Sequence, residues 1–228
     1  MTSWRAGFHR AVSTGMAVAA VCMLAPGLCA ESDGRWNVGV GVAYAFAYDS
    51  DYESVSESAT GYGQDRLESG FGAHLGVGYR FTRFSVEAEI VHFKNDTDQF
   101  ESEDGGSAES TTGDFTHTAL MFNGGIYLRP MKTWKPYAGI GLGVSRFSIN
   151  DLTDLDGDFR IDGRDTVLAL QATVGVAYDL SDPVDLEFGY RVFWSDEAEA
   201  TGIGQGGESF INTSGPVLIH SIDFGVRF

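Results

Sequence analysis

One segment of the sequence spaces its acidic residues as a cation site would. Carboxylates recur at every second position around Gly157, at Asp154, Asp156 and Asp158, and Asp162 follows. Such a run of oxygen ligands can wrap a hard cation such as Ca²⁺. It departs from an EF-hand, because glycine comes directly after Asp156 and no glutamate closes the loop. Two interpretations stay open, a Ca²⁺ site formed by these four aspartates and an ordinary acidic turn. The sequence implies no other cofactor.

The histidines offer little for catalysis. A hydrolytic site needs a histidine beside a serine or threonine on one face, with a carboxylate to orient it. His220 and Ser221 are neighbours, so in a strand they point to opposite faces. His92 and His117 also fall on opposite faces by strict alternation, and only a β-bulge would bring them together. The sequence therefore predicts no catalytic residue and no enzyme.

The overall composition excludes two broad classes. The chain has 228 residues, a formal net charge of −17, 30 glycines and 13% aromatic residues. A nucleic-acid partner is excluded by the acidic balance, because such a surface must be basic. No apolar stretch long enough for a transmembrane helix occurs after the first thirty residues. The glycine and aromatic content is typical of a β-rich chain.

The first thirty residues have the features of a secretory signal peptide. Arg5 and Arg10 precede an apolar stretch that ends at small Ala30. We predict cleavage after Ala30, which leaves 31–228 as a single barrel domain; a membrane anchor is the alternative. Both cysteines fall within this leader, so the mature chain is predicted to have no disulfide.

Eight segments of the remaining chain alternate apolar and small or polar residues with the period of a β-strand. The apolar face of each segment is built from Val, Leu, Ile, Phe and Tyr, and the other face from Gly, Ala, Ser and charged residues. The predicted strands span 36–48, 70–81, 84–93, 115–129, 136–149, 168–180, 184–194 and 217–228.

Short and long connections alternate between these segments, so every long connection leaves from the same end of the sheet. Bacterial outer-membrane barrels have this plan, with an apolar face toward lipid and small or polar residues inside. A membrane sheet must also close, because lipid cannot satisfy a free edge. The sequence therefore predicts an all-β fold, an eight-stranded antiparallel up-and-down transmembrane β-barrel with short periplasmic turns and long extracellular loops. A soluble barrel, with the apolar face inside, is the alternative.

Charged residues of both signs alternate onto the predicted inner face. Buried charges must pair, and this mixture allows it. We predict a salt-bridge network that plugs the lumen, and the rival interpretation is a gated ion path through the same groups. The network comprises Arg80, Glu87, Glu89, Arg129, Asp185, Glu187, Arg191, Asp223 and Arg227.

Aromatic residues near the strand ends are predicted to form the two interfacial girdles of the barrel. Near the short turns these are Trp36, Phe81, Phe84, Trp134, Tyr178 and Phe228. Near the long connections they are Tyr44, Phe46, Phe93, Phe147 and Trp194. Lys94 and Arg146 also lie near the long connections, and we hypothesise that they meet lipopolysaccharide phosphates.

Most of the 32 acidic residues lie in the four long connections, where only Arg66, Arg160 and Arg164 oppose them. The excess negative charge is thus predicted to face one side of the membrane. Solubility and mutual repulsion are one explanation. The other is a surface that attracts a basic partner or one bridged by divalent cations.

Two segments resemble a known family. Residues 120–130 (LMFNGGIYLRP) and 135–144 (KPYAGIGLGV) resemble the fourth and fifth strands of small outer-membrane β-barrel proteins, the OmpA-like and opacity-type surface proteins. The ending IDFGVRF is similar to the family's C-terminal assembly signal, through Phe224, Val226 and Phe228. The resemblance implies an outer-membrane location, contact with outer-membrane lipid and lipopolysaccharide, and the barrel-assembly machinery as a partner.

The family resemblance says little about activity, because such proteins include adhesins, structural anchors, solute conduits and lipid A-modifying enzymes. We therefore expect a structural or surface-interaction protein that acts through its acidic loops. A narrow porin-like conduit for ions or small solutes is the first alternative, and a lipid A-modifying barrel enzyme is the second.

Overall fold

A computed structural model of the chain describes most residues after the predicted leader. The described ranges are 34–47, 50–55, 60–67, 69–81, 83–102, 109–128, 133–154, 159–204 and 209–228. The predicted signal peptide, residues 1–30, lies outside them. Within the described part of the chain, no helix is long and apolar enough to cross a membrane.

All regular structure in the described residues is β-strand. The strands are β1 (Arg35–Ala47), β2 (Ser50–Val55), β3 (Thr60–Leu67), β4 (Gly70–Arg80), β5 (Phe84–Ser102), β6 (Glu109–Tyr127), β7 (Trp134–Asp154), β8 (Phe159–Ser181), β9 (Val184–Ser195), β10 (Ala198–Gly204), β11 (Ser209–Ser214) and β12 (Val217–Arg227).

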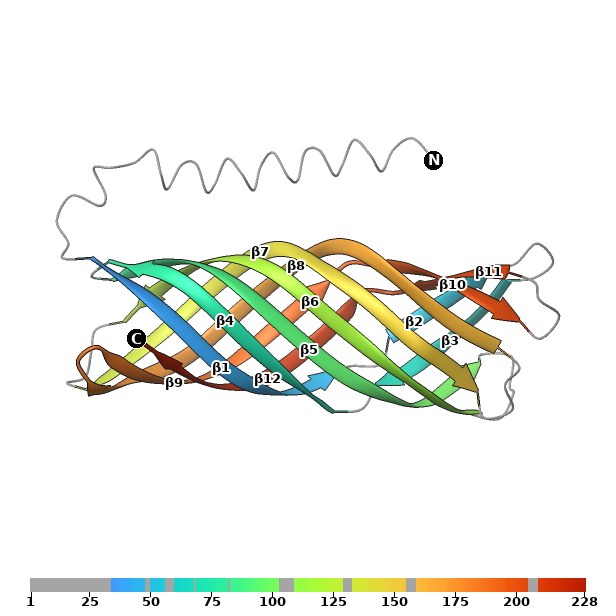
Figure 1. Cartoon of the computed structure of the whole chain (residues 1–228), viewed down its shortest axis with the longest axis horizontal. Coiled ribbons are helices and arrows are strands. Elements are labelled where there is room, and N and C mark those ends of the chain that lie inside the picture. The colour runs from blue at the N-terminus through green and yellow to red at the C-terminus, as the bar shows by residue number, and fades with distance from the viewer. Residues whose placement is uncertain are drawn as a thin grey trace, which may run out of the picture.

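Eight of these strands form a closed antiparallel barrel, as predicted (Figure 1). Around the wall the order is β1, β4, β5, β6, β7, β8, β9 and β12, and β12 pairs with β1 to close the ring. We call these strands the membrane ring. Closure leaves no free edge, which is the condition for a sheet in hydrocarbon.

The predicted long loops are only partly loops, and this corrects the expected strand ends. β5, β6, β7 and β8 run far past the predicted boundaries, and β2, β3, β10 and β11 continue the wall between them. β3 pairs with β5, and β10 pairs with β8, so these four strands and the extended ends of β5–β8 form a second closed ring, which we call the distal ring. The prediction missed it because beyond the lipid both strand faces can be polar, and the alternation then disappears.

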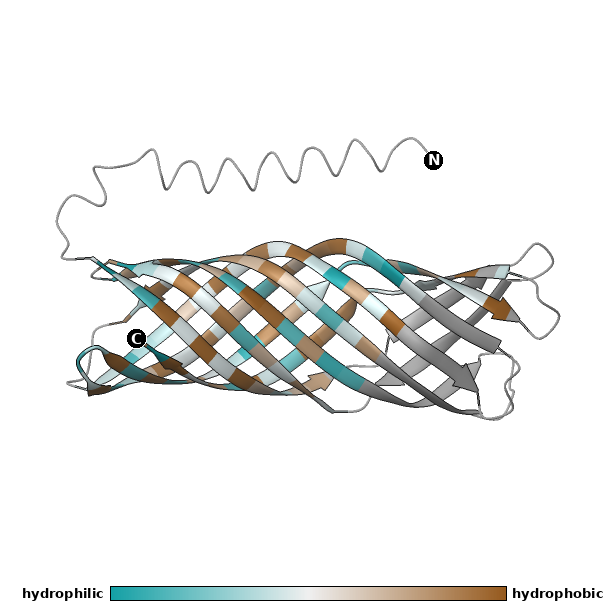
Figure 2. Ribbon diagram, in the orientation of Figure 1, coloured by the Kyte–Doolittle hydropathy of each residue, from teal (hydrophilic) through white to brown (hydrophobic). Residues whose placement is uncertain are grey.

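Hydrophobic residues (brown) alternate with paler or teal residues along the strands of the membrane ring (Figure 2), and the side chains that point outward from the middle of these strands are mostly apolar. Val42, Ile140 and Phe188 are 61%, 73% and 60% exposed, as side chains that face lipid would be. On the inner face the lumen is narrow. At Gly41, for example, a Cβ atom would lie 2.7 Å from the carbonyl oxygen of Phe224 and would also collide with His74. Small inner residues therefore make room for the larger side chains that fill the lumen.

Candidate functional site

The lumen nearest the short turns contains three clusters of charged side chains, and the first is centred on Arg191. The Arg191 Nε donates to Asp223 Oδ2 at 2.7 Å, and its Nη2 donates to Glu89 Oε1 at 2.9 Å. Its Nη1 donates to the Gln171 side chain at 2.9 Å. Asn123 and Gln171 each donate to Glu89 Oε2 at 2.8 Å. This cluster ties five strands together through one buried guanidinium.

The second cluster is centred on Arg227, near the end of β12. Its Nε and Nη2 donate to the two carboxylate oxygens of Glu187 at 2.7 and 3.0 Å, in a bidentate pair. Its Nη1 donates to Asn37 Oδ1 at 2.6 Å and also contacts Glu87. The last strand is thereby joined to its wall neighbours β9 and β1 and, across the lumen, to β5.

The third cluster lies beside the short turns and is centred on Asp185. Arg80 Nη1 donates to Asp185 Oδ2 at 2.7 Å, and Lys135 Nζ donates to Asp185 Oδ1 at 3.3 Å. Lys135 also pairs with Asp179. Arg80 donates to the Tyr127 hydroxyl at 3.0 Å, with its guanidinium carbon 4.4 Å from that ring's centre. Lys135, Asp179 and Tyr127 were not among the predicted lumen residues, although the same alternation, continued to the strand ends, would have included them.

Eight of the nine predicted lumen residues thus lie in these three clusters, and Arg80 Nη2, 3.9 Å from Glu187, links the second cluster to the third. The ninth, Arg129, lies outside the described residues. A buried pair of this kind is costly to break, because removing one partner leaves an uncompensated charge. We refer to these three clusters together as the charged half of the lumen.

A cavity of about 70 Å³ lies within the charged half. Its wall includes Glu87, Glu89, Glu187, Arg191, Asp223 and Arg227, with His74 at one side. A polar space of this size holds a few water molecules. Water there can satisfy lone pairs that the direct ion pairs leave open.

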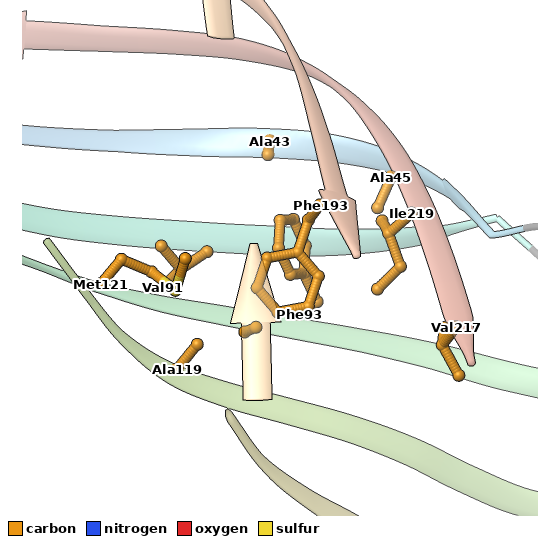
Figure 3. Packing of buried hydrophobic residues seen from close by; sticks show 10 residues of the cluster. Ala43, Ala45, Val91, Phe93, Ala119, Met121, Phe193, Val217 and Ile219 are labelled. Atoms are coloured by element: carbon orange, nitrogen blue, oxygen red, sulfur yellow. The ribbon is translucent and has the colours of Figure 1, made fainter. Parts of the chain in front are cut away.

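Toward the long connections the lumen changes to apolar packing. The side chains of Phe93 and Phe193 face each other with ring centres 5.4 Å apart (Figure 3). Both residues are at most 1% exposed, and Met121 beside them is fully buried. The cluster comprises Ala43, Ala45, Val91, Phe93, Ala119, Met121, Ala169, Phe193, Val217 and Ile219.

A second apolar cluster lies farther toward the distal ring. It comprises Phe115, Phe147, Ile149, Val167, Ala198 and Ala200. The Phe147 ring lies 5.7 Å from that of Phe115, and both side chains are buried. We call these two clusters the apolar half of the lumen.

The apolar half corrects one prediction about the aromatic girdles. Phe93 and Phe147 were assigned to the outer girdle near the long connections, but both are 1% exposed and lie inside the barrel. Their strand parity requires this, because Ile90 on β5 and Val144 on β7 face outward. Tyr44 and Phe46 do lie on the outer face, 42% and 39% exposed. At these two positions strand alternation, and not residue type, decides which face the side chain occupies.

The histidines lie in three different environments. His117 is buried in the apolar half, with its Nδ1 3.4 Å from Ser145 Oγ and its ring 4.9 Å from that of Phe147. Within the described hydrogen bonds this pair has no carboxylate partner. His92 faces outward and bonds to Thr118.

On the last strand, His220 contacts the Tyr190 hydroxyl, whereas Ser221 points inward and donates to Asp223 at 2.8 Å. In each of the two pairs considered from the sequence, His92 with His117 and His220 with Ser221, the two members therefore lie on opposite faces of the wall. The His117–Ser145 contact was missed, and the pairing of β6 with β7 is what creates it.

The predicted Ca²⁺ segment falls outside the side chains that the structure describes. Asp156 and Asp158 lie outside the described residues, and the side chains of Asp154 and Asp162 are likewise not described. Among the described residues, no group of three or more His, Cys, Asp or Glu side chains is arranged to hold a metal. The calcium site stays a prediction.

Comparison with known proteins agrees with this architecture. The model of the outer membrane protein beta-barrel domain family matches residues 13–214. No curated protein matches the sequence significantly.

Solved structures of outer-membrane proteins have the same fold. OprG from Pseudomonas aeruginosa is 17% identical, with a TM-score of 0.64 over 87% of this chain and 97% of OprG. Neisserial surface protein A is 21% identical, with a TM-score of 0.53 over 85% of this chain and 97% of that protein. The outer membrane protease OmpT of Escherichia coli is only 6% identical, with a TM-score of 0.53 over 86% of this chain and 97% of OmpT. These structural likenesses concern the fold alone. Because the family model spans most of the sequence, this chain belongs to the outer membrane protein beta-barrel domain family and is a barrel of the outer membrane.

Proposed function

We propose that this protein is a closed, non-conducting barrel with a structural and surface-interaction role, exerted through its acidic external segments. The observation that carries the proposal is the filled lumen. Phe93, Phe193 and Met121 pack across it with almost no exposed surface, and ion pairs fill it below them. An ion that crossed would have to leave water, which is costly in an apolar passage.

The external segments support the second part of the proposal. The long connections carry most of the acidic residues, and the described strands of the distal ring extend the wall beyond the membrane ring. A surface of this charge favours a basic partner or one held through divalent cations. The predicted Ca²⁺ segment around Gly157 would be one place for such a cation.

Single-channel recording in planar lipid bilayers tests the closed lumen. The folded wild-type barrel is expected to give no regular conductance steps in concentrated salt, while a porin inserted under the same conditions gives them. Regular steps from the wild type would contradict the proposal. They would favour the narrow conduit, for which the polar cavity of the charged half is the supporting observation.

A cationic probe tests the role of the external charge. Asp98, Glu101, Glu103 and Asp104 can be changed together to Asn or Gln in cells that display the barrel. Binding of fluorescent polylysine should fall relative to the wild type, and Ca²⁺ in the medium should reduce wild-type binding. Unchanged polylysine binding would mean that this acidic segment does not recruit basic partners.

The absence of catalysis is also part of the proposal. His117 and Ser145 are sealed within apolar side chains, where no lipid could reach them without a rearrangement of the lumen. Mass spectra of lipid A from cells with and without the protein are expected to be identical. A new lipid A mass in the expressing cells would establish the lipid A-modifying enzyme instead.

A further inference from the structure

Two rows of polar side chains cross the outer face of β5, β6, β7 and β8, on neighbouring levels. The strand register aligns each row from one strand to the next. The first row is His92, Thr118, Arg146 and Thr166. The second row is Lys94, Thr116, Ser148 and Arg164.

All eight side chains point away from the lumen. The three cations are exposed, as are His92 and Thr118, whose side chains hydrogen-bond at 2.9 Å across the two strands. Neither row contains an acidic residue. We call these eight residues the wall patch.

The wall patch lies at the edge of the lipid-facing surface. One step toward the short turns, the same register gives an entirely apolar row of Ile90, Leu120, Val144 and Leu168. One step the other way, it gives Asp96, Asp114 and Asn150. The patch therefore stands between the hydrocarbon zone and the acidic external segments. In an outer-membrane barrel this is the level of the outer-leaflet headgroups.

The opposite wall differs at its own outer edge. The described outer-face side chains of β9, β12, β1 and β4 include no lysine or arginine. They are mostly aromatic or aliphatic, such as Trp194, Phe46 and Phe71, with His220 and the hydroxyls of Tyr44 and Tyr190 among them. Aromatic belts position a barrel in any bilayer. A cluster of lysine and arginine side chains on one side only suits a particular headgroup.

We propose that the wall patch binds the phosphate groups of the phosphorylated glycolipid in the outer leaflet, with its acyl chains against the apolar row. Adjacent strands lie about 4.8 Å apart, so β5 and β7 are about 10 Å apart, a gap that Lys94 and Arg146 can span from both sides. Arg164 lies diagonally next to Arg146, at about 7–8 Å. Arginine forks and hydroxyl donors are the groups that bind phosphate oxygens best.

This site concerns the outer wall and does not depend on whether the lumen conducts. A free phosphate ion would be a poor occupant, because the patch is flat and exposed and water competes there. The apolar row directly beside it adds burial of acyl chains, which only a lipid provides. The two contributions together select a lipid that carries phosphate.

Lipid titration tests the proposal. The folded barrel in phosphatidylcholine nanodiscs is titrated with bisphosphorylated lipid A or with the same lipid after enzymatic dephosphorylation, and bound lipid is counted by native mass spectrometry. The wild type is expected to bind the phosphorylated lipid at least about tenfold more tightly. Inorganic phosphate at the same concentration should not displace it.

The combined variant Lys94→Gln, Arg146→Gln and Arg164→Gln is expected to lose that preference, with binding of dephosphorylated lipid A unchanged. Arg83→Gln, which removes an exposed cation beside a short turn, is the matched control and should bind as the wild type does. Heat-modifiable gel mobility verifies that each variant is folded, and Arg146→Gln alone replaces the combined variant if that does not fold. Wild-type binding by the variant, or equal affinity of the wild type for both lipids, would overturn the proposal. The three cations would then balance the charge of the neighbouring acidic row.

Discussion

The two halves of the lumen lie inside the same eight strands, yet they are filled by opposite chemistry. On β5, the inner positions change from Glu87 and Glu89 to Val91 and Phe93 with no break in the strand. On β9, they change from Asp185 and Glu187 to Phe193, with buried Arg191 between them. The barrel wall therefore does not dictate what fills it. The same backbone holds ion pairs around a polar cavity at one level and aromatic packing at the next.

The difference predicts two kinds of sensitivity. In the charged half, stability depends on each charge having its partner, since an unpaired buried charge is costly whatever its size. In the apolar half, stability depends on volume, since lost contacts and cavities are what cost free energy there. The stability lost with a charge should therefore be regained by neutralising its partners, and the stability lost with an aromatic ring by restoring side-chain volume.

Loss of Arg191 should have the largest effect. Arg191→Met leaves Glu89 and Asp223 buried without their cation and is expected to lower the free energy of unfolding by about 3–5 kcal/mol. Urea unfolding of the folded barrel in lipid vesicles measures this. Adding Glu89→Gln and Asp223→Asn to Arg191→Met should restore much of the loss. If the triple variant is as unstable as the single one, charge pairing is not what stabilises this half.

Loss of a ring in the apolar half should come next. Phe193→Ala removes a fully buried side chain and is expected to cost about 3 kcal/mol, through the cavity it leaves beside Phe93. Phe188→Ala on the lipid-facing side of the same strand is the control and should cost clearly less. Phe193→Leu should recover most of the loss, since volume matters here. Equal costs for the inner and outer phenylalanine would argue against a packed apolar half.

A glycine pair gives a smaller and finer comparison. At Gly41 an added methyl would meet the carbonyl oxygen of Phe224 and the ring of His74, so Gly41→Ala should cost about 1–3 kcal/mol. At Gly124 a Cβ atom would have nothing within 4 Å, and Gly124→Ala should be neutral or slightly stabilising. Unfolding by urea again measures both. A neutral Gly41→Ala would show that the lumen is wider at this level than the geometry implies.

Alternation was enough to predict the membrane ring and which charges face inward, because the lipid requires one apolar face on every strand. It could not predict the partners. Arg191 meets Glu89 across 102 positions of sequence, and only the stagger of the closed barrel brings them together. The distal ring escaped prediction because the sequences of β2, β3, β10 and β11 lack the regular apolar alternation of the membrane ring.

The apolar half was missed for a different reason. Phe93 and Phe147 have inward parity, and only their aromatic type and their position near the long connections suggested the outer girdle. A barrel lumen was expected to be small and polar at every level. The lesson is that strand parity is better evidence than residue type for deciding which face an aromatic residue occupies.

Thiol labelling tests the central claim, that the apolar half seals the polar cavity of the charged half from the outside. Both cysteines of the sequence precede Ala30, so on cleavage after Ala30 the mature chain has none and Ser85→Cys, in the cavity wall, would supply its only thiol. A small membrane-impermeant thiol reagent added to intact cells should leave this introduced cysteine unmodified. It should react once Phe93→Ala and Phe193→Ala are added. Rapid labelling of the introduced cysteine from outside in the otherwise wild-type barrel would contradict the account, because the lumen would then be open to water along its length.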